Sequence, residues 1–273
     1  MLLAVAEKKL DALRRLLREQ TPLLVAYSGG VDSAFLLAVA VDVLGDNCQG
    51  VIADSPSLPR QALVDAKALA QQMSARLRVI PTTEMDDPSY TSNSINRCYF
   101  CKAELFTRLD ALARAEGFRA IAYGENADDA LQVRPGRDAA AAFRVLAPLR
   151  DVGLTKKEIR ALSRMLQLPT ADAPAQPCLS SRIPHGTPVT VIALGMIERA
   201  ETIVRSYGFR IFRVRHHLSE NRPQARIEIL PDEMPHLTGI SESLCAKLRE
   251  LGYDEVVIDP RGYRAPAALP PIV

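Results

Sequence analysis

The sequence predicts an α/β fold: a doubly wound, mostly parallel sheet joined to a smaller C-terminal α+β domain. Over residues 1–170, short apolar segments alternate with segments that repeat apolar residues at helical spacing. This pattern is typical of parallel sheets with helices on both faces. Beyond a proline-rich stretch at residues 171–188 the alternation stops. We therefore expect one domain at residues 1–185 and a second at residues 186–273.

Each element follows from its apolar spacing or its flanking residues. In the first domain we expect strands at 23–27, 50–53, 77–80 and 120–123, and helices at 3–18, 34–44, 59–73 and 102–116. A further helix opens at Thr155, where Glu158 completes a capping-box pattern. In the second domain we expect strands at 211–216, 225–230 and 255–258, and helices at 191–207 and 241–251. Ligands bind beyond the carboxyl ends of parallel strands, which places a site at residues 27–28, 54–55 and 124–125.

Composition excludes several classes of protein. The 273 residues are 48% hydrophobic and 24% charged, which is ordinary for a globular chain. The net charge of +2, without a basic run, argues against a dedicated nucleic-acid binder. No apolar stretch approaches the roughly 20 residues that cross a bilayer, and the N-terminus lacks the pattern of a secretory signal. We expect a cytoplasmic protein without membrane contact.

The segment Ser28-Gly29-Gly30-Val31-Asp32-Ser33 lies between a predicted strand and a helix. Two glycines let the backbone approach a ligand, and the amides of the turn and helix start face an anion. A plain turn capped by Asp32 or Ser33 is the structural alternative. The hexapeptide resembles the PP-loop of the ATP-pyrophosphatases, which cleave ATP between the α- and β-phosphates and share an adenine nucleotide alpha-hydrolase-like fold. The resemblance implies nucleotide contacts from Ala26, Ser28, Gly29, Gly30, Asp32 and Ser33.

A second polar segment, at residues 124–129, follows the fourth predicted strand. Acidic residues at a strand end can hold Mg²⁺ against phosphates. The alternative is a solvated helix start, with Asp128 and Asp129 near the positive end of the helix dipole. Beside a PP-loop we favour the first interpretation, and expect Gly124, Asp128 and Asp54 to help hold ATP and Mg²⁺.

The chain has five cysteines, and three of them suggest a common site. Cys48 and Cys245 stand alone and are expected to be small buried hydrophobes. Cys98 and Cys101 form a CxxC, compatible with a redox pair, half a zinc site or cluster ligands. With Cys178, and without a well-placed fourth ligand, the three thiolates suit a 4Fe–4S cluster with one open iron better than a closed zinc site. An inert pair is the alternative.

Five segments together, at residues 28–33, 96–102, 123–129, 134–137 and 177–184, resemble the LarE family. These sulfur transferases build the nickel-pincer nucleotide cofactor of lactate racemase. The resemblance implies that ATP adenylates a carboxylate of pyridinium-3,5-biscarboxylic acid mononucleotide. A sulfur nucleophile then displaces AMP and leaves a thiocarboxylate.

The family has two forms that differ in the source of sulfur. In one, a cysteine at the position of Cys178 gives up its own sulfur and becomes dehydroalanine. In the other, three cysteines hold a 4Fe–4S cluster whose fourth iron carries a labile sulfide. With Cys98, Cys101 and Cys178 present, this chain resembles the cluster form, which implies that all three are catalytic and bind iron.

The second domain is expected to bind substrate or to form a homo-oligomer. Arg213 and Arg215 are two residues apart on a predicted strand and so share a face. Arginines bind phosphate bidentately, and with Arg182 these two are candidates for the substrate's 5′-phosphate; exposed arginines on a solvated face are the alternative. Four carboxylates are expected to be solvated rather than to hold a metal or a subunit contact: Glu198, Glu201, Glu228 and Asp232.

Three other functions are also compatible with parts of the sequence. A tRNA thiolase also uses a PP-loop and cysteines, but it needs an RNA-binding surface. The near-neutral charge and the 5% aromatic content of this chain argue against such a surface. NAD and GMP synthetases share the loop without needing the three cysteines. A non-catalytic nucleotide- or cluster-binding regulator would release no pyrophosphate. The expected partners are a nucleotide substrate, a second copy of the chain and a sulfide donor protein.

Overall fold

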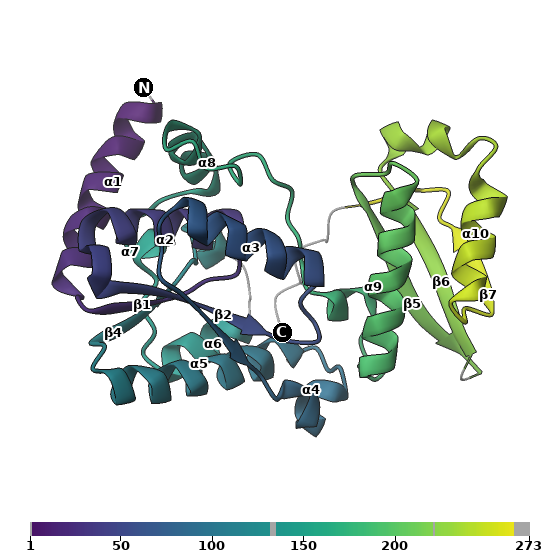
Figure 1. Cartoon of the computed structure of the whole chain (residues 1–273), viewed down its shortest axis with the longest axis horizontal. Helices are drawn as coiled ribbons and strands as arrows, with labels where there is room; N and C mark the ends of the chain where they lie inside the picture. The colour runs from purple at the N-terminus through teal and green to yellow at the C-terminus, as the bar shows by residue number, and fades with distance from the viewer. Residues whose placement is uncertain (1, 132–134, 221, 265–273) are drawn as a thin grey trace.

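The computed structural model describes residues 2–131, 135–220 and 222–264. Its main element is a four-stranded parallel sheet in the order β3-β2-β1-β4 (Figure 1). The strands are β1 (Leu23–Ala26), β2 (Cys48–Asp54), β3 (Leu77–Pro81) and β4 (Ala120–Tyr123). The expected doubly wound α/β fold is confirmed.

Alternation along the strands divides the core into two layers, because successive side chains of a strand point to opposite faces. On β1, Leu23 and Val25 pack with helices α1 (Leu2–Glu19), α2 (Val31–Leu44), α3 (Arg60–Gln72), α7 (Pro148–Asp151) and α8 (Lys156–Met165). Leu24 and Ala26 pack on the other face, against α5 (Arg97–Glu116) and α6 (Pro135–Ala142). The helices therefore cover both faces, as Figure 1 shows.

A second sheet follows the proline-rich stretch. It has the order β5-β6-β7, with β5 (Phe212–Ser219) and β6 (Arg222–Ile229) antiparallel and β7 (Glu255–Ile258) parallel to β6. Helices α9 (Val191–Ser206) and α10 (Ser241–Glu250) pack on it around a separate apolar core. The smaller α+β part is thus also confirmed, while the division at residue 185 stays a prediction.

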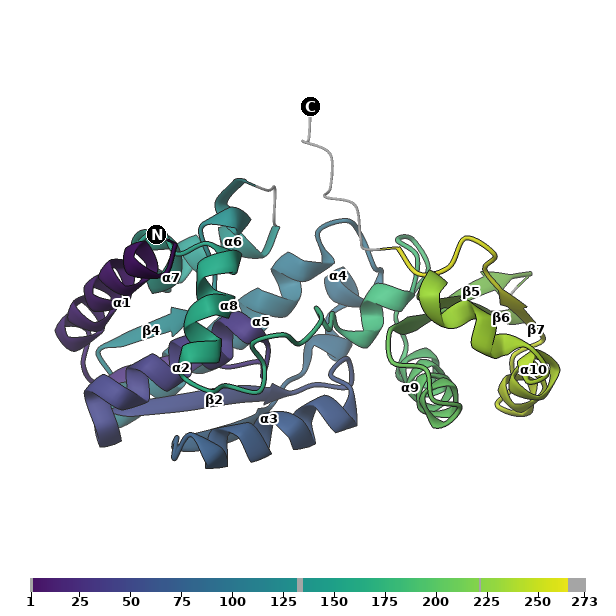
Figure 2. The ribbon, with the colours of Figure 1, turned by 90° about the horizontal axis from the view of Figure 1, so that it is seen from above.

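The two parts lie side by side, and the chain passes between them near the short turn η4 (Leu179–Arg182) (Figures 1 and 2). A four-residue helix, α4 (Pro88–Thr91), lies on the side of the first part that faces the second part. Among the described residues, no helix is long and apolar enough to cross a membrane.

One element begins earlier than expected, and this moves two cysteines. The helix predicted from residue 102 starts at Arg97, so Cys98 and Cys101 lie in the first turns of α5 rather than in a loop. Buried Arg97 explains the difference. Its guanidinium donates to the carbonyl of Ser180 at 2.9 Å and to the side chain of Asn93, which fixes the helix start through tertiary contacts.

Candidate functional site

The PP-loop segment lies at the carboxyl edge of the parallel sheet. Ala26 pairs with both Val51 and Tyr123, so the residues that follow β1 and β4 meet at this edge. The amide of Ser28 donates to Ser33 Oγ at 3.1 Å, and Ser33 Oγ donates to the Gly30 carbonyl at 3.1 Å. The loop is therefore closed on itself, while Ser28 and Gly30 remain exposed towards solvent.

Three glycines of the site are constrained in different ways. Gly29 has φ +75°, and a Cβ there would lie 2.9 Å from Ala66 Cβ, so the fold itself requires glycine. A Cβ on Gly124 would lie 2.7 Å from the amide nitrogen of Ser33. Gly30 differs, because a Cβ there would meet only Ser28 Oγ, at 3.5 Å. The space beside exposed Gly30 is thus open.

Asp32 is held by two partners from other segments. Its Oδ2 accepts bonds from Lys156 Nζ at 2.7 Å and from Asn126 Nδ2 at 3.3 Å. Its Oδ1 is buried and has no hydrogen-bond partner within the described part of the chain. Because buried carboxylate oxygens are rarely left unpaired, Oδ1 fits a ligand that the structure does not contain, and a Mg²⁺ ion suits an oxygen donor.

The sequence did not point to Lys156, although it joins two predicted site residues. Its backbone amide donates to Asp128 Oδ2 at 2.7 Å while its ammonium group contacts Asp32. Lys156 is the first residue of α8, directly after the Thr155 cap. No spacing rule links residues 32 and 156, so only the fold shows this contact.

Near the loop, buried Glu125 accepts hydrogen bonds from two arginines and a tyrosine. It accepts from Arg137 Nε at 2.8 Å, Arg150 Nη1 at 2.9 Å and the Tyr123 hydroxyl. Burial acts to raise the pKa of Glu125, but these bonds outweigh it and leave the pKa below its usual range. Asp54, at the end of β2, is ion-paired with Arg60. The predicted nucleotide residues of the first part thus all lie along this edge of the sheet.

The three predicted cysteines come from two segments that meet. Cys98 is exposed, whereas Cys101 and Cys178 are half-buried. Burial raises the pKa of the Cys101 thiol, and negative charge on Cys178, Glu84 or Cys98 raises it further. The thiols therefore lie within electrostatic reach of one another. Cys48 and Cys245 are buried, as predicted.

This arrangement does not by itself form a metal site. Three thiols are suitable donors for iron. Among the residues that the structure describes, however, no group of three or more His, Cys, Asp or Glu side chains is arranged to hold a metal ion. The donor chemistry thus fits a cluster, although the described side chains are not arranged as a ready set of metal ligands.

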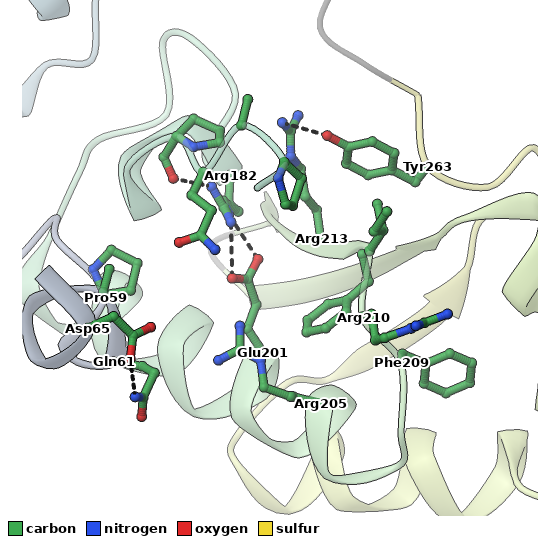
Figure 3. A pocket seen from close by; sticks show the side chains of 17 residues that line it. Pro59, Gln61, Asp65, Arg182, Glu201, Arg205, Phe209, Arg210, Arg213 and Tyr263 are labelled. Atoms are coloured by element: carbon green, nitrogen blue, oxygen red, sulfur yellow. Dashed lines mark hydrogen bonds and ion pairs between the residues drawn. The ribbon is translucent and has the colours of Figure 1, made fainter. Parts of the chain in front are cut away.

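A cavity of about 390 Å³ lies where the two parts meet (Figure 3). Its walls come from the start of α3, the segment 174–177, α9, residues 209–213 and Tyr263. Arg182 and Arg213 both line it. Its described lining contains no PP-loop residue, so the arginine site is distinct from the loop.

The cavity arginines are held by protein partners. Arg182 Nε and Nη2 donate to the two carboxylate oxygens of Glu201 at 2.8 and 3.1 Å, and both side chains are buried. Arg213 Nη2 donates to the Tyr263 hydroxyl at 3.1 Å. Burial lowers the pKa of Arg213, and the nearby charges of Arg182 and Arg215 act in the same direction.

Two carboxylate predictions were wrong. Glu201 is buried against Arg182, and half-buried Glu228 accepts from Arg215 Nε at 3.1 Å, so neither is solvated. Both pair with arginines of neighbouring segments, which the strand pattern alone did not reveal. Arg215 also donates to the Ser181 carbonyl at 2.9 Å and is not among the described residues that line the cavity.

Known proteins resemble this chain over nearly its whole length. An uncharacterised protein of Synechocystis is 41% identical over 262 residues, covering 95% of this chain and 96% of the relative. The pyridinium-3,5-bisthiocarboxylic acid mononucleotide synthase of Lactiplantibacillus plantarum is 30% identical over 242 residues, covering 88% of this chain and 86% of that enzyme. An uncharacterised protein of Methanocaldococcus jannaschii is 27% identical, covering 94% and 98% respectively.

The part of the chain that contains the PP-loop also resembles a second family. Residues 6–115, which include the PP-loop and the first three strands, match the NAD synthase family. That match and the loop geometry agree on a PP-loop domain that uses ATP. Together with the long match to the Lactiplantibacillus enzyme, they show that this chain belongs to the LarE family of PP-loop enzymes.

Proposed function

We propose that this chain is an ATP-dependent sulfur transferase of nickel-pincer cofactor synthesis, which forms AMP and pyrophosphate. It adenylates a carboxylate of pyridinium-3,5-biscarboxylic acid mononucleotide and converts it to a thiocarboxylate. One observation carries the proposal: the thiol segment adjoins the nucleotide edge. The amide of Leu179, next to Cys178, donates to the carbonyl of Ser57, three residues after Asp54, at 2.8 Å.

The nucleotide step follows from the charges around the PP-loop. The open face of Gly30 admits the phosphates, and Asp32 Oδ1 with Asp128 would hold Mg²⁺ against them. Lys156 would offset the charge of the leaving pyrophosphate. A substrate carboxylate oxygen attacks the α-phosphorus, the bond to the bridging oxygen of the β-phosphate breaks, and pyrophosphate leaves with that electron pair. The product is an acyl adenylate.

Substrate binding is assigned to the arginine cavity. The positive charges of Arg182 and Arg215 act to lower the pKa of Arg213, so both lie near its guanidinium. A phosphate dianion would relieve that repulsion and accept bidentate hydrogen bonds. We therefore propose that the substrate's 5′-phosphate binds at Arg182 and Arg213, while Arg215, outside the described lining of the cavity, adds positive charge nearby.

The sulfur step is assigned to Cys98, Cys101 and Cys178. A 4Fe–4S cluster bound by these thiols would supply sulfide at an iron without a protein ligand. The sulfur nucleophile adds to the acyl carbon, AMP leaves with the electron pair of the carbon–oxygen bond, and the thioacid releases its proton. A sulfide donor protein would renew the sulfur, and we propose that the enzyme acts in the cytoplasm as a homo-oligomer.

A turnover assay tests the function. Wild-type protein with ATP, Mg²⁺, sulfide and the biscarboxylic mononucleotide should yield equal amounts of AMP, pyrophosphate and thiocarboxylate. Arg213→Ala should raise the substrate KM by about 10- to 100-fold, equivalent to roughly 1.5–3 kcal/mol for a charged hydrogen bond. Arg249→Ala, on the exposed surface of α10, is the control. AMP formation that requires tRNA instead would identify a thiolase.

Iron analysis tests the source of sulfur. Anaerobically prepared protein should contain about four irons per chain, and Cys98→Ala, Cys101→Ala or Cys178→Ala should each remove most of them. Cys48→Ala is the control, because Cys48 is buried away from the three thiols. A colourless protein that turns over once per chain and loses ~34 Da at Cys178 in doing so, as loss of H₂S would give, would instead identify the sacrificial form.

A further inference from the structure

Three buried hydroxyl groups beside the thiols form a closed ring of hydrogen bonds. Ser57 Oγ bonds to the Tyr90 hydroxyl, Tyr90 bonds to Ser180 Oγ at 2.7 Å, and Ser180 Oγ bonds back to Ser57 Oγ at 3.0 Å. The exposed fractions of Ser57, Tyr90 and Ser180 are 3%, 1% and 0%. We refer to these three side chains as the hydroxyl ring.

The hydroxyl ring joins three segments that are distant in sequence. Ser57 follows β2 at the nucleotide edge, Tyr90 belongs to α4, and Ser180 lies two residues after Cys178. Two further bonds reinforce the junction. One is the bond from the Leu179 amide to the Ser57 carbonyl, and the other runs from Arg97, at the start of α5, to the Ser180 carbonyl at 2.9 Å. Both cysteine segments are therefore anchored at this point.

The ring also adjoins both segments that carry the thiols. Tyr90 and Leu179 belong to one buried apolar cluster, and Cys101 and Phe100 pack on that cluster. The Tyr90 hydroxyl bonds to Ser180 Oγ, two residues after Cys178. Tyr90 thus contacts the loop of one cysteine and the packing surface of the other.

We propose that Tyr90 is a positioning residue, whose hydroxyl closes the ring that holds the Cys178 loop beside Cys101 at the nucleotide edge. Removing that hydroxyl breaks two of the three bonds in the ring and leaves Ser57 and Ser180 paired only with each other. The proposed function explains why the two sulfurs must meet, but their proximity can be measured without any turnover.

A short bifunctional thiol reagent, dibromobimane, measures this proximity. We use the full-length chain, freed of metal with a chelator and reduced, in a Cys98→Ser background, where Cys101 and Cys178 are the remaining cysteines that are not buried. Tryptic mass spectrometry then quantifies the bridged peptides. We expect Tyr90→Phe to slow bridging at least fivefold. Tyr207→Phe is the matched control, because its hydroxyl bonds to Ser243 Oγ at 2.7 Å in the second part.

A single-site reagent separates positioning from loss of packing. N-ethylmaleimide should modify half-buried Cys101 at the same slow rate in Tyr90→Phe and in the parent protein. Slower bridging with unchanged Cys101 protection supports the proposal. Unchanged bridging overturns it, and so does slower bridging accompanied by faster modification of Cys101, since that pattern reports general loosening. If the Cys98→Ser parent bridges as expected but the wild-type protein, with all its cysteines, never transfers sulfur, the proposed function fails and the positioning role stands.

Discussion

The two adjacent glycines of the PP-loop have different physical roles. Gly29 is required by the fold, through its positive φ and its contact with Ala66. Gly30 has φ −75°, which any residue adopts, and has room for a Cβ. Its lack of a side chain therefore matters only when a ligand approaches.

Alanine substitutions should separate these roles. Gly29→Ala should lower the free energy of unfolding by about 2–3 kcal/mol, from left-handed strain and overpacking. Gly30→Ala should change it by less than about 1 kcal/mol, yet reduce AMP formation roughly a hundredfold through misplacement of the nucleotide. Urea unfolding and a radiolabelled AMP assay measure the two effects. Normal turnover by Gly30→Ala would place the nucleotide elsewhere.

At the level of single residues, the sequence around each position predicted only part of the site. Ser28–Ser33 was identifiable because strand, turn and helix follow one another within a few residues. Lys156 and Asp32 are 124 positions apart and meet only through the fold. Tyr90 was not predicted, because a tyrosine in a four-residue helix belongs to no motif. Contacts between distant segments need the tertiary structure.

Among the elements, α8 begins at the nucleotide edge with the predicted capping box. Thr155 Oγ1 accepts from the Glu158 amide, and Glu158 Oε2 accepts from the Thr155 amide at 2.9 Å. Glu158 is also ion-paired with Lys9 of α1 at 2.7 Å. This cap holds Lys156, the next residue, in place.

Removing the Thr155 cap should therefore lower the free energy of unfolding more than removing a helix cap that makes a single hydrogen bond. We expect Thr155→Ala to lower the free energy of unfolding by about 1–2 kcal/mol, and Thr190→Ala by about 0.5–1 kcal/mol. Thr190 caps α9 through a single bond from the Ala193 amide and so serves as the control. Urea denaturation of both variants tests this, and equal losses would contradict the added role of Glu158.

The boundaries of helices and strands were predictable where residues close in sequence determine them. The Thr155 start and the strand Glu255–Ile258 agree with the sequence prediction. The start of α5 was wrong by five residues, because Arg97 is fixed by Ser180, 83 residues away. That error carried Cys98 and Cys101 from an expected loop into a helix.

For the whole molecule, two neighbouring histidines on β5 predict sensitivity to acid. Burial lowers the pKa of His216 below its usual value of 6.5, and the positive charge of His217 acts in the same direction. Burial and nearby Arg226 likewise lower the pKa of His217. The unfolded chain therefore binds these protons at higher pH than the folded chain, and stability falls as pH drops below about 6.5.

We expect the melting temperature to decrease as the pH is lowered from 7.5 to 5.5. Each histidine contributes at most about 1.4 kcal/mol per pH unit. His216→Gln should reduce the slope, whereas His236→Gln, at an exposed position, should not. Calorimetry at several pH values measures the slopes, and a slope of opposite sign in the wild type would refute the assignment.

The hydroxyl ring has a further property that follows from its closure. Each oxygen donates once and accepts once, so the three protons can run clockwise or anticlockwise with the same number of bonds. In either sense the three O–H dipoles point head to tail around a triangle, and their vectors nearly cancel. All three O–H donors of the ring are therefore used within it, so the ring fixes the position of the Cys178 loop without donating a hydrogen bond to either sulfur.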